Sequence, residues 1–463
     1  MSRVLDQLQS GDLRSLCASF LYFDTGFTVW LLFGPLAPYI GPQLHLPPAA
    51  MGFLVATPVL SGALLRVPLG QLYQAWDGRK IAFMGIFLSA LPPLYLLTQP
   101  FAPSLALLSL LGVLLGVGGA SFAVALPMAG SGYAPQVQGL VLGLAAAGNI
   151  GAVLDGVLFP PLARAYGWPL AIAAVLPLLA MAALVMAAWG RDYAPKAGSV
   201  ARGLAAFAAT AALLGLLVLG ILNGWFGVTA HPAILLLPLL GIGFVVTLLP
   251  AAQRKVLRQF DSWAFFLIYA ITFGGFVGMS AYIAVLLIAL YHIPKIDAGL
   301  LMAALAFTGA TIRPLGGLLA DRFTGPRALR YALSGIALVD LLFAFAAPAR
   351  LPGVVALFLL YVCFGVGNGA AFQIVPMRWP DRRGLMTGLI GAAGGIGGFY
   401  IPVILGIAKQ QTMSYRGGFA IFASLAIVAA LVVQARADAW IRHATHVRMA
   451  SERTSQEMAI EGD

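Results

Sequence analysis

The segments Ser61-Gly62-Ala63-Leu64-Leu65-Arg66 and Thr308-Gly309-Ala310-Thr311-Ile312-Arg313 each place an arginine inside a long apolar stretch, one in each half of the chain. An ionised side chain at the centre of a bilayer helix costs about 2.5–3.5 kcal/mol on insertion scales. No acidic residue lies within four positions of either arginine. Because such a charge needs a partner, we expect both guanidinium groups to face a site between the two halves and to bind an anion from solution.

The composition indicates a polytopic membrane protein. Of the 463 residues, 61% are hydrophobic and 9% are charged, whereas a soluble domain carries about 25% charged residues. Cys17 and Cys363 lie alone in apolar segments, which predicts neither a disulfide framework nor a metal site. The first apolar run lacks a small-residue cleavage site, so we expect no cleavable signal peptide. Fourteen stretches have membrane-spanning length, near 15–40, 50–74, 80–98, 103–130, 137–163, 168–190, 203–222, 232–252, 262–291, 299–320, 328–348, 353–377, 385–408 and 417–440.

The net charge of +11 is explained by where the basic residues lie along the chain. If the N-terminus lies inside, the inside segments hold 20 of the 27 Lys and Arg residues and the outside loops hold five. The remaining two are Arg66 and Arg313. This asymmetry follows the positive-inside rule, so we expect both termini in the cytoplasm and no nucleic-acid partner.

The two halves form an internal repeat with an offset of 245 to 250 residues. Gly119-Ala120-Ser121-Phe122 matches Gly369-Ala370-Ala371-Phe372, and Pro127-Met128 matches Pro376-Met377. Parallel repeats of six helices, with the substrate site between them, are the architecture of the major facilitator superfamily. We therefore expect an all-α polytopic membrane protein with this fold, in which two six-helix bundles are related by pseudo-two-fold symmetry.

This offset is long for six helices, and the surplus lies at 203–252 between the halves. It predicts two extra apolar helices, which keep the second half in its original orientation and give fourteen helices. We expect this pair to be peripheral because it carries no ionisable residue at mid-depth. We also expect the polar tail to lack fixed structure. The expected divisions are an N-terminal six-helix bundle (1–195), a linker with the inserted helices (196–258), a C-terminal six-helix bundle (259–442) and a polar cytoplasmic tail (443–463).

A loop motif supports the superfamily. The stretch Gly317-Leu-Leu-Ala-Asp321-Arg322-x-x-Gly325-x-Arg327 resembles the superfamily's motif between the second and third helices of a half. Its acid caps a helix and its basic residues face the cytoplasm. The first half keeps Gly70 and Gly78 but has Gln74 where the acid would stand.

Two glycine-rich helices are more specific. Glycines at spacings of three and four leave one helix face flat, so backbones can approach closely and slide, although ordinary tight packing alone would also explain one copy. Both copies stand at equivalent places in the two halves. Their glycines are Gly139, Gly143, Gly148 and Gly151 in the first helix, and Gly384, Gly388, Gly391, Gly394 and Gly397 in the second.

Together these motifs resemble the NarK-type nitrate/nitrite porter family, over both six-helix halves but not over 203–252. In that family one arginine from each half clamps the anion and aromatic side chains sandwich it. Gly395 stands where a second asparagine would complete the symmetry, so the site would be asymmetric. The resemblance implies that the anion binds Arg66, Arg313, Tyr269, Phe122, Phe273 and Asn149.

The chemistry of nitrate fits two arginines. A guanidinium is planar, always charged, and matches an oxyanion with two parallel hydrogen bonds. Aromatic faces suit a flat delocalised ion and would exclude tetrahedral phosphate or sulfate by shape. Nitrate and nitrite are therefore the expected ligands.

The coupling mechanism is left open between exchange and symport. An anion that enters a cell with a negative interior moves against the membrane potential, at a cost of about 2.3 kcal/mol per 100 mV. Passive uniport would therefore expel nitrate. Facing arginines repel when no anion is bound, which favours nitrate/nitrite antiport by alternating access. Proton symport would need at least two protons and a titrating group, and we consider Asp24 and Asp155 as possible proton sites, with Asp340 as a further buried acid.

Other functions are less favoured. A facilitator for another small anion or a drug would lack the paired glycine helices, and a channel would not need a two-fold repeat with buried charges. An enzyme would need haem-ligand histidine pairs, cysteine clusters or a catalytic set, and the five histidines fall in or near loops. We expect no enzymatic activity, cofactor or metal, and a monomer in the lipid bilayer of the bacterial cytoplasmic (inner) membrane.

Overall fold

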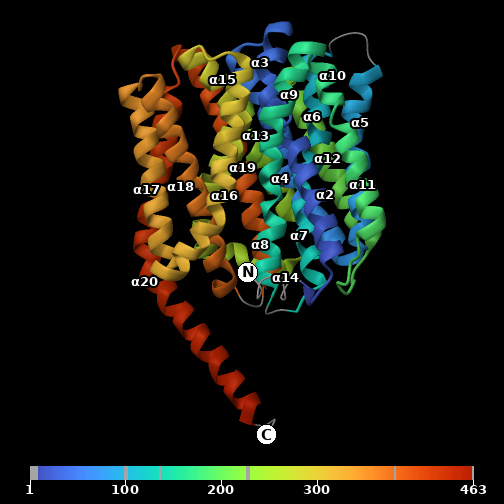
Figure 1. Ribbon diagram of the computed structural model, residues 1–463, viewed down its shortest axis with the longest axis vertical. Coiled ribbons are helices and arrows are strands. Elements are labelled where there is room, and N and C mark those ends of the chain that lie inside the picture. The colour runs from blue at the N-terminus through green and yellow to red at the C-terminus, as the bar shows by residue number, and fades with distance from the viewer. Residues whose placement is uncertain (1–8, 99–102, 135–136, 226–229, 380–381, 461–463) are drawn as a thin grey trace.

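A computed structural model describes residues 9–98, 103–134, 137–225, 230–379 and 382–460 (Figure 1). These residues form helices and no β-strand. They include 14 helical segments long and apolar enough to cross a membrane, which confirms the predicted all-α fold and the predicted number of helices.

In the N-terminal half, several membrane-crossing segments consist of two consecutive helices. Prolines lack the backbone N–H that helix hydrogen bonds require, and they recur inside these segments, as at Pro38, Pro127 and Pro160. The elements are α2 (Leu13–Leu31), α3 (Phe33–Gln43), α4 (Pro48–Ala75), α5 (Gly78–Thr98), α6 (Leu105–Ala120), α7 (Phe122–Ser131), α8 (Gln138–Ala146), η1 (Ala147–Ile150), α9 (Gly151–Tyr166), α10 (Trp168–Ala173) and α11 (Leu176–Trp189).

The rest of the chain holds the inserted pair and the C-terminal half, whose helices are longer and less interrupted. The inserted pair is α12 (Val200–Leu222) and α13 (Ala230–Leu248), followed by α14 (Ala251–Arg254) and η2 (Lys255–Arg258). The C-terminal half consists of α15 (Phe260–Tyr291), α16 (Lys295–Phe323), α17 (Gly325–Leu341), η3 (Leu342–Ala346), α18 (Arg350–Arg378), α19 (Arg383–Thr412) and α20 (Arg416–Ile460).

The two glycine-rich helices differ in form. The second is part of the continuous helix α19, whereas the first is divided into α8, a 3₁₀ turn (η1) and α9. Gly148 and Asn149 lie in that turn. A 3₁₀ stretch inside a helix often marks a hinge, so the two halves are not equivalent at this point.

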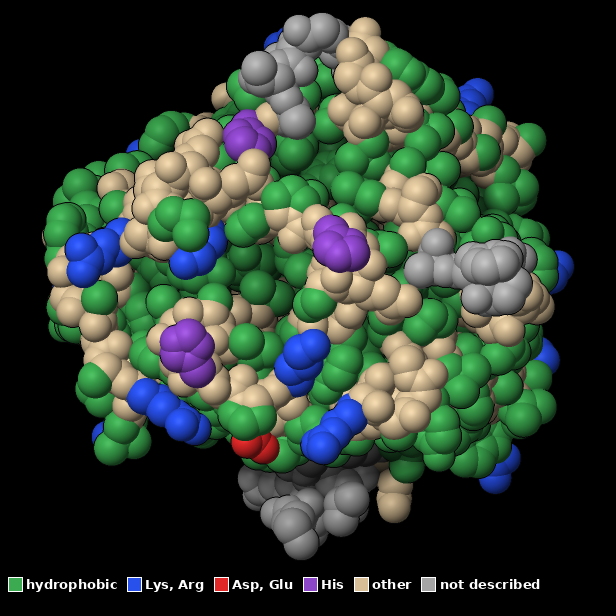
Figure 2. All heavy atoms as spheres, turned by 90° about the horizontal axis from the view of Figure 1, so that it is seen from above, with side chains coloured by type: hydrophobic (Ala, Val, Ile, Leu, Met, Phe, Trp, Pro, Cys, Tyr) green, Lys and Arg blue, Asp and Glu red, His purple; other side chains and the backbone are tan. Residues whose placement is uncertain are grey.

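We call the end of the bundle where α2 begins and α20 leaves it the terminal end, and the opposite end, which carries α3 and α10, the distal end (Figure 1). Viewed from the distal end, the molecule shows mostly hydrophobic and uncharged polar surface with scattered Lys and Arg side chains (Figure 2). At the terminal end α20 continues as one helix to Ile460, whereas the sequence predicts a tail without fixed structure.

Close backbone contacts between the halves lie between mid-depth and the distal end. A Cβ atom at Gly52 of α4 would collide with the carbonyl oxygen of Pro402 in α19. At Gly34 of α3 it would lie 2.9 Å from the carbonyl oxygen of Ala281 in α15. Glycine therefore lets the distal parts of the two halves meet backbone to backbone.

The inserted pair packs along the seam between α4 and α19. Helix α12 lies against α4 and α6, and α13 lies against α4 and α19. A side chain at Gly241 of α13 would collide with Leu64 of α4, and the Tyr400 hydroxyl of α19 donates a 3.1 Å hydrogen bond to the Leu235 carbonyl of α13. The pair thus contacts both halves from outside the two bundles.

Candidate anion site between the two halves

Arg66 is held in the interior by carbonyl groups from both halves. Its side chain is only 2% exposed. Nε donates to the Gly119 carbonyl oxygen of α6 at 3.0 Å, and Nη1 donates to the Gly391 carbonyl oxygen of α19 at 2.8 Å. Nη2 is also buried and has no hydrogen-bond partner among the described residues. Part of the guanidinium is therefore still available to a ligand.

Three aromatic rings surround the Arg66 guanidinium. Its Cζ atom lies 4.7 Å from the ring centroid of Trp30, 5.0 Å from that of Phe122 and 5.6 Å from that of Phe273. Cations are attracted to aromatic faces at such distances. The indole Nε1 of Trp30 donates a 2.8 Å hydrogen bond to the Pro58 carbonyl oxygen of α4, which fixes the ring.

Arg313 approaches the same aromatic group from α16. Its Nη2 donates a 3.2 Å hydrogen bond to the Tyr269 hydroxyl. Tyr269 is stacked on Phe273 with ring centroids 5.1 Å apart and an interplanar angle of 9°. Phe372 closes this side, 5.5 Å from the Arg313 Cζ atom and edge-on to Tyr269. The stacked pair on α15 therefore lies between the two arginines.

The glycines of the second glycine-rich helix leave room for the Tyr269 and Phe273 rings. A Cβ atom at Gly394 would lie 2.7 Å from the Tyr269 ring and 2.8 Å from the Phe273 ring. At Gly397 it would collide with the backbone of Ala270. The glycines at these positions thus allow α19 to lie directly against α15.

The first glycine-rich helix uses its glycines against α2. A Cβ atom at Gly148 would lie 2.7 Å from the Phe23 ring, and one at Gly151 would collide with the Asp24 carbonyl oxygen. Not every signature glycine is tightly packed, since a Cβ atom added at Gly143 or Gly388 would meet nothing within 4 Å. Gly139 and Gly384 lie in α8 and α19, but their surroundings are outside the described part of the structure.

Asn149 is buried in η1, with 2% of its side chain exposed, and its Oδ1 has no hydrogen-bond partner among the described residues. Its counterpart Gly395 packs against Ala63 of α4, 2.6 Å from the position of a Cβ atom. The two halves therefore differ at this level, and contact of Asn149 with an anion stays a prediction.

The two acidic candidates lie together outside the arginine group. Asp155 of α9 is fully buried, and neither of its carboxyl oxygens has a hydrogen-bond partner among the described residues. Asp24 of α2 is half-buried, and its Oδ1 likewise lacks one. Asp340 is buried in α17, in the other half.

Sequence reasoning missed Trp30 and Phe372. Both lie in apolar stretches in which an aromatic residue is ordinarily a packing residue. A weak signal existed for Phe372, because it stands at the repeat position of Phe122. No local pattern distinguishes Trp30, whose role depends on the approach of α4 to α2.

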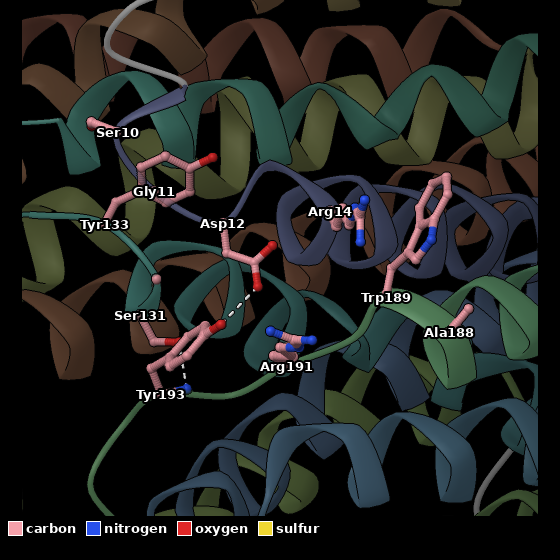
Figure 3. Close-up of a pocket in the computed structure, with 11 residues that line it drawn as sticks. Ser10, Gly11, Asp12, Arg14, Ser131, Tyr133, Ala188, Trp189, Arg191 and Tyr193 are labelled. Atoms are coloured by element: carbon pink, nitrogen blue, oxygen red, sulfur yellow. Dashed lines mark hydrogen bonds between the residues drawn. The ribbon is translucent and has the colours of Figure 1, made fainter.

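A separate pocket of about 560 Å³ opens at the terminal end, away from both arginines (Figure 3). Within it the Tyr193 hydroxyl donates a 2.8 Å hydrogen bond to Asp12. Partial burial opposes ionisation of Asp12, but hydrogen bonds from the Ser15 N–H and from Tyr193 hold its pKa below the usual value. The pocket lies among the start of α2, the end of α7 and the chain after α11, so it belongs to the N-terminal half alone.

Asp192, just after α11, supplies the acid that the loop motif of the first half lacks at Gln74. Its Oδ2 accepts a 2.7 Å hydrogen bond from the Gly78 N–H at the start of α5. Its Oδ1 accepts one from the Tyr73 hydroxyl at 2.8 Å, and the Lys196 Nζ atom lies 2.5 Å from Oδ2. Burial opposes its ionisation, but these contacts hold the pKa of Asp192 below the usual value.

Comparison with known proteins agrees with this architecture. Residues 17–402 match the sequence profile of the Major Facilitator Superfamily. The partially occluded inward-open xylose transporter XylE of E. coli has the same fold, with a TM-score of 0.60 at 12% identity over 90% of this chain and 97% of that one.

Three relatives, each from a bacterium, resemble most of the chain. The "Nitrite extrusion protein" of Bacillus subtilis is 29% identical over 93% of this chain and 95% of its own. The "Probable nitrate/nitrite transporter NarK2" of Mycobacterium tuberculosis is 31% identical over 87% and 91%. The "Probable nitrate/nitrite antiporter NarK1" of Thermus thermophilus is 28% identical over 88% of each chain. The chain therefore belongs to the major facilitator superfamily and, within it, to the NarK-type nitrate/nitrite transporter family.

Proposed function

We propose that this protein carries nitrate and nitrite across the membrane by alternating access, with the anion bound between Arg66 and Arg313. The observation that supports this most directly is the stacked Tyr269–Phe273 pair. It contacts the Arg66 guanidinium on one side and hydrogen-bonds Arg313 on the other. A buried arginine from one half and a partly exposed arginine from the other thus share one aromatic wall, with no acidic partner among the described side chains.

The geometry favours a small planar oxyanion. The free Nη2 of Arg66 can donate to one oxygen of the anion, and Arg313, being partly exposed, can donate to another. Phe122 and Phe273 lie within 6 Å of the Arg66 Cζ atom, so a bound ion would lie among ring faces. A tetrahedral ion such as sulfate would have to push the rings apart, which a close-packed interior resists.

The charge distribution suggests which side is closed. With the terminal end in the cytoplasm, the backbone contacts of Gly34 and Gly52 with the other half lie on the outer side. The arrangement then corresponds to a carrier closed toward the outside. Transport would require α3 and α4 to separate from α15 and α19 at that end.

Exchange of nitrate for nitrite is the coupling that the arginines favour. Two positive charges that share one wall repel each other when no anion is present, and this repulsion grows where the surroundings have a low dielectric constant. A bound anion relieves it, so the loaded carrier changes conformation more readily than the empty one. Exchange also moves no net charge against the membrane potential.

Proteoliposomes loaded with nitrite and supplied with labelled nitrate outside test this proposal. With the same pH on both sides, we expect rapid uptake that requires internal nitrite, that external nitrite inhibits, and that Arg66→Lys and Arg313→Lys abolish. Sulfate and phosphate at equal concentration should not compete. Uptake that both lysine variants sustain, or competition by sulfate equal to that by nitrite, would overturn the clamp, and a carrier for another small anion would then be the better explanation.

A further inference from the structure

Two carboxyl groups lie in the membrane-embedded contact between α2 and α9. Asp155 is fully buried, and among the described residues neither of its carboxyl oxygens nor Oδ1 of Asp24 has a hydrogen-bond partner. The Thr28 hydroxyl of α2 donates to the Gly151 carbonyl at 3.2 Å, and the Gly151 N–H is a hydrogen-bond partner of Asp24. Unpaired ionised carboxylates are expensive inside a membrane, where such residues are rare and mark functional sites.

The two helices touch at this point. A Cβ atom at Gly151 would collide with the Asp24 carbonyl oxygen and would lie 2.8 Å from the Thr28 nitrogen. Asp155 follows Gly151 by four residues, so it lies on the same face of α9, one turn further along. Both acids are therefore next to the same apolar seam.

Neither acid forms an ion pair with a Lys or Arg of the described residues. Helix α9 packs against α2, α3, α10, α16 and η1, and α2 packs additionally against α4, α5, α6, α7, α8, α11 and α15. The charged residues on these elements, besides the two acids, are Arg14, Arg66, Arg79, Lys80, Arg164, Asp261, Lys295, Asp297, Arg313, Asp321 and Arg322. Arg66 is engaged by Gly119 and Gly391, and most of the others stand near helix ends.

We propose that Asp24 and Asp155 form a proton-binding site whose occupancy is linked to the anion site. This inference rests on the proposed function and adds a second ligand to it. In the arrangement described above, Asp155 has no hydrogen-bond partner among the described residues and Asp24 has the Gly151 N–H, so burial favours the proton-bound form of the pair. Release of the protons requires that the seam gain access to water.

The seam is connected to both arginines. Asp24 follows Phe23, whose ring lies edge-on to Phe122 at 5.5 Å, and Phe122 is 5.0 Å from the Arg66 Cζ atom. On the other side, a Cβ atom at Gly156, the residue after Asp155, would collide with the Gly299 carbonyl of α16, the helix that carries Arg313.

The sign of the linkage follows from charge. When the anion leaves, the charges of Arg66 and Arg313 are uncompensated, and ionised carboxylates nearby lower the electrostatic free energy of the empty carrier. When the anion binds, its negative charge favours protonation of both acids. Anion and protons therefore bind cooperatively, and each must increase the affinity for the other.

Two protons per nitrate carry one net positive charge inward, which the membrane potential drives. During exchange the acids stay protonated and no net proton movement occurs. When no nitrite is available, the empty carrier returns with its acids ionised. With this site the same carrier can exchange nitrate for nitrite and can also take up nitrate together with protons when no nitrite is available.

The test compares two assays on the same proteoliposomes. Wild-type vesicles without internal nitrite should take up nitrate when the outside is acidic, and an internal pH dye should report about two protons per nitrate. Asp155→Asn and Asp24→Asn should lower this uptake at least about tenfold, because coupling free energies of 1–3 kcal/mol correspond to 5- to 150-fold effects. Exchange into nitrite-loaded vesicles should persist. Asp340→Asn is the matched control, since it removes a buried acid from the other half.

Each outcome is decisive. Wild-type exchange without any effect of the pH gradient, or proton-driven uptake that survives both substitutions, overturns the proton site and leaves the proposed function intact. Failure of wild-type exchange itself overturns the proposed function instead. If Asp155→Asn does not fold, the protons bound by detergent-solubilised wild type and Asp24→Asn on addition of nitrate can be counted by calorimetry in two buffers. Fewer protons in the variant support the site, and equal numbers exclude it.

Discussion

The Arg66 guanidinium donates a 2.8 Å hydrogen bond to the carbonyl oxygen of Gly391, which belongs to the other half of the molecule. The same guanidinium donates to Gly119 in its own half. Arg66 is therefore both part of the candidate anion site and a cross-half contact in the closed arrangement. A change of conformation has to break the bond to Gly391, and an oxyanion is well suited to replace that carbonyl.

Arg66→Lys should remove most transport activity although it keeps the charge. An ammonium lacks the planar fork, so it cannot donate to Gly119, to Gly391 and to an anion in the same geometry. Each hydrogen bond to a charged group contributes about 1.5–3 kcal/mol, so we expect a loss of at least about tenfold in the exchange rate. Initial rates of labelled nitrate uptake measure this, with size-exclusion profiles as the folding control. Wild-type rates in the variant would contradict the geometric argument.

We expect Trp30 to hold the Arg66 guanidinium in position. Its indole N–H is bonded to the Pro58 carbonyl, so it is not available to the anion. Trp30→Phe keeps a ring near the guanidinium but loses the bond to the Pro58 carbonyl, and Trp30→Ala loses both. We expect the KM for nitrate to rise modestly in the first variant and by about fivefold or more in the second, since a desolvated cation–π contact contributes about 1–2 kcal/mol. A fall in maximal rate at unchanged KM would show that Trp30 acts elsewhere in the cycle.

The glycines of α19 offer a matched pair of substitutions. Gly394→Ala places a methyl group 2.7 Å from Tyr269 and 2.8 Å from Phe273, so it should displace the stacked rings and lower transport strongly. Gly388→Ala meets nothing within 4 Å and should leave transport close to wild type. Equal activity of the two variants in the exchange assay would mean that glycine in α19 serves helix sliding in general and not the placement of these rings.

Asp192→Asn should destabilise the junction between α5 and the chain after α11. The carboxylate accepts from Gly78 and Tyr73 and pairs with Lys196, and its pKa lies below the usual value in the folded protein. Ionised Asp192 therefore stabilises the fold above its unfolded pKa of about 3.9, and this stabilisation is lost as the pH falls through the lower folded value. Thermal melting should show a lower Tm for the variant at pH 7, with the gap closing below about pH 4. A gap that does not change with pH would assign the effect to packing.

The sequence predicts the fold well because bilayer insertion requires long apolar helices, and those are visible locally. Arg66 and Arg313 are visible for the same reason, since an unpaired charge inside an apolar stretch has few structural explanations. Trp30 and Asp192 could not be predicted this way. Each acts through a contact between segments far apart in the chain, Trp30 with α4 and Asp192 with α5. The helical continuation of α20 to Ile460 was also not predicted, because a polar composition indicates solvent exposure but does not exclude a helix.

Among the described elements, the inserted helices add extensive contacts at one of the two seams between the halves, the α4–α19 seam, and not at the α9–α16 seam. At the α4–α19 seam, α13 adds the Tyr400–Leu235 hydrogen bond and the packing of Gly241 on Leu64. At the α9–α16 seam, where Gly156 meets Gly299, neither α12 nor α13 is among the described elements that pack extensively against α9 or α16. We therefore expect the two halves to rotate about the α4–α19 seam when the carrier opens, so that the largest displacement occurs at the α9–α16 seam. Water would then enter first beside Asp155.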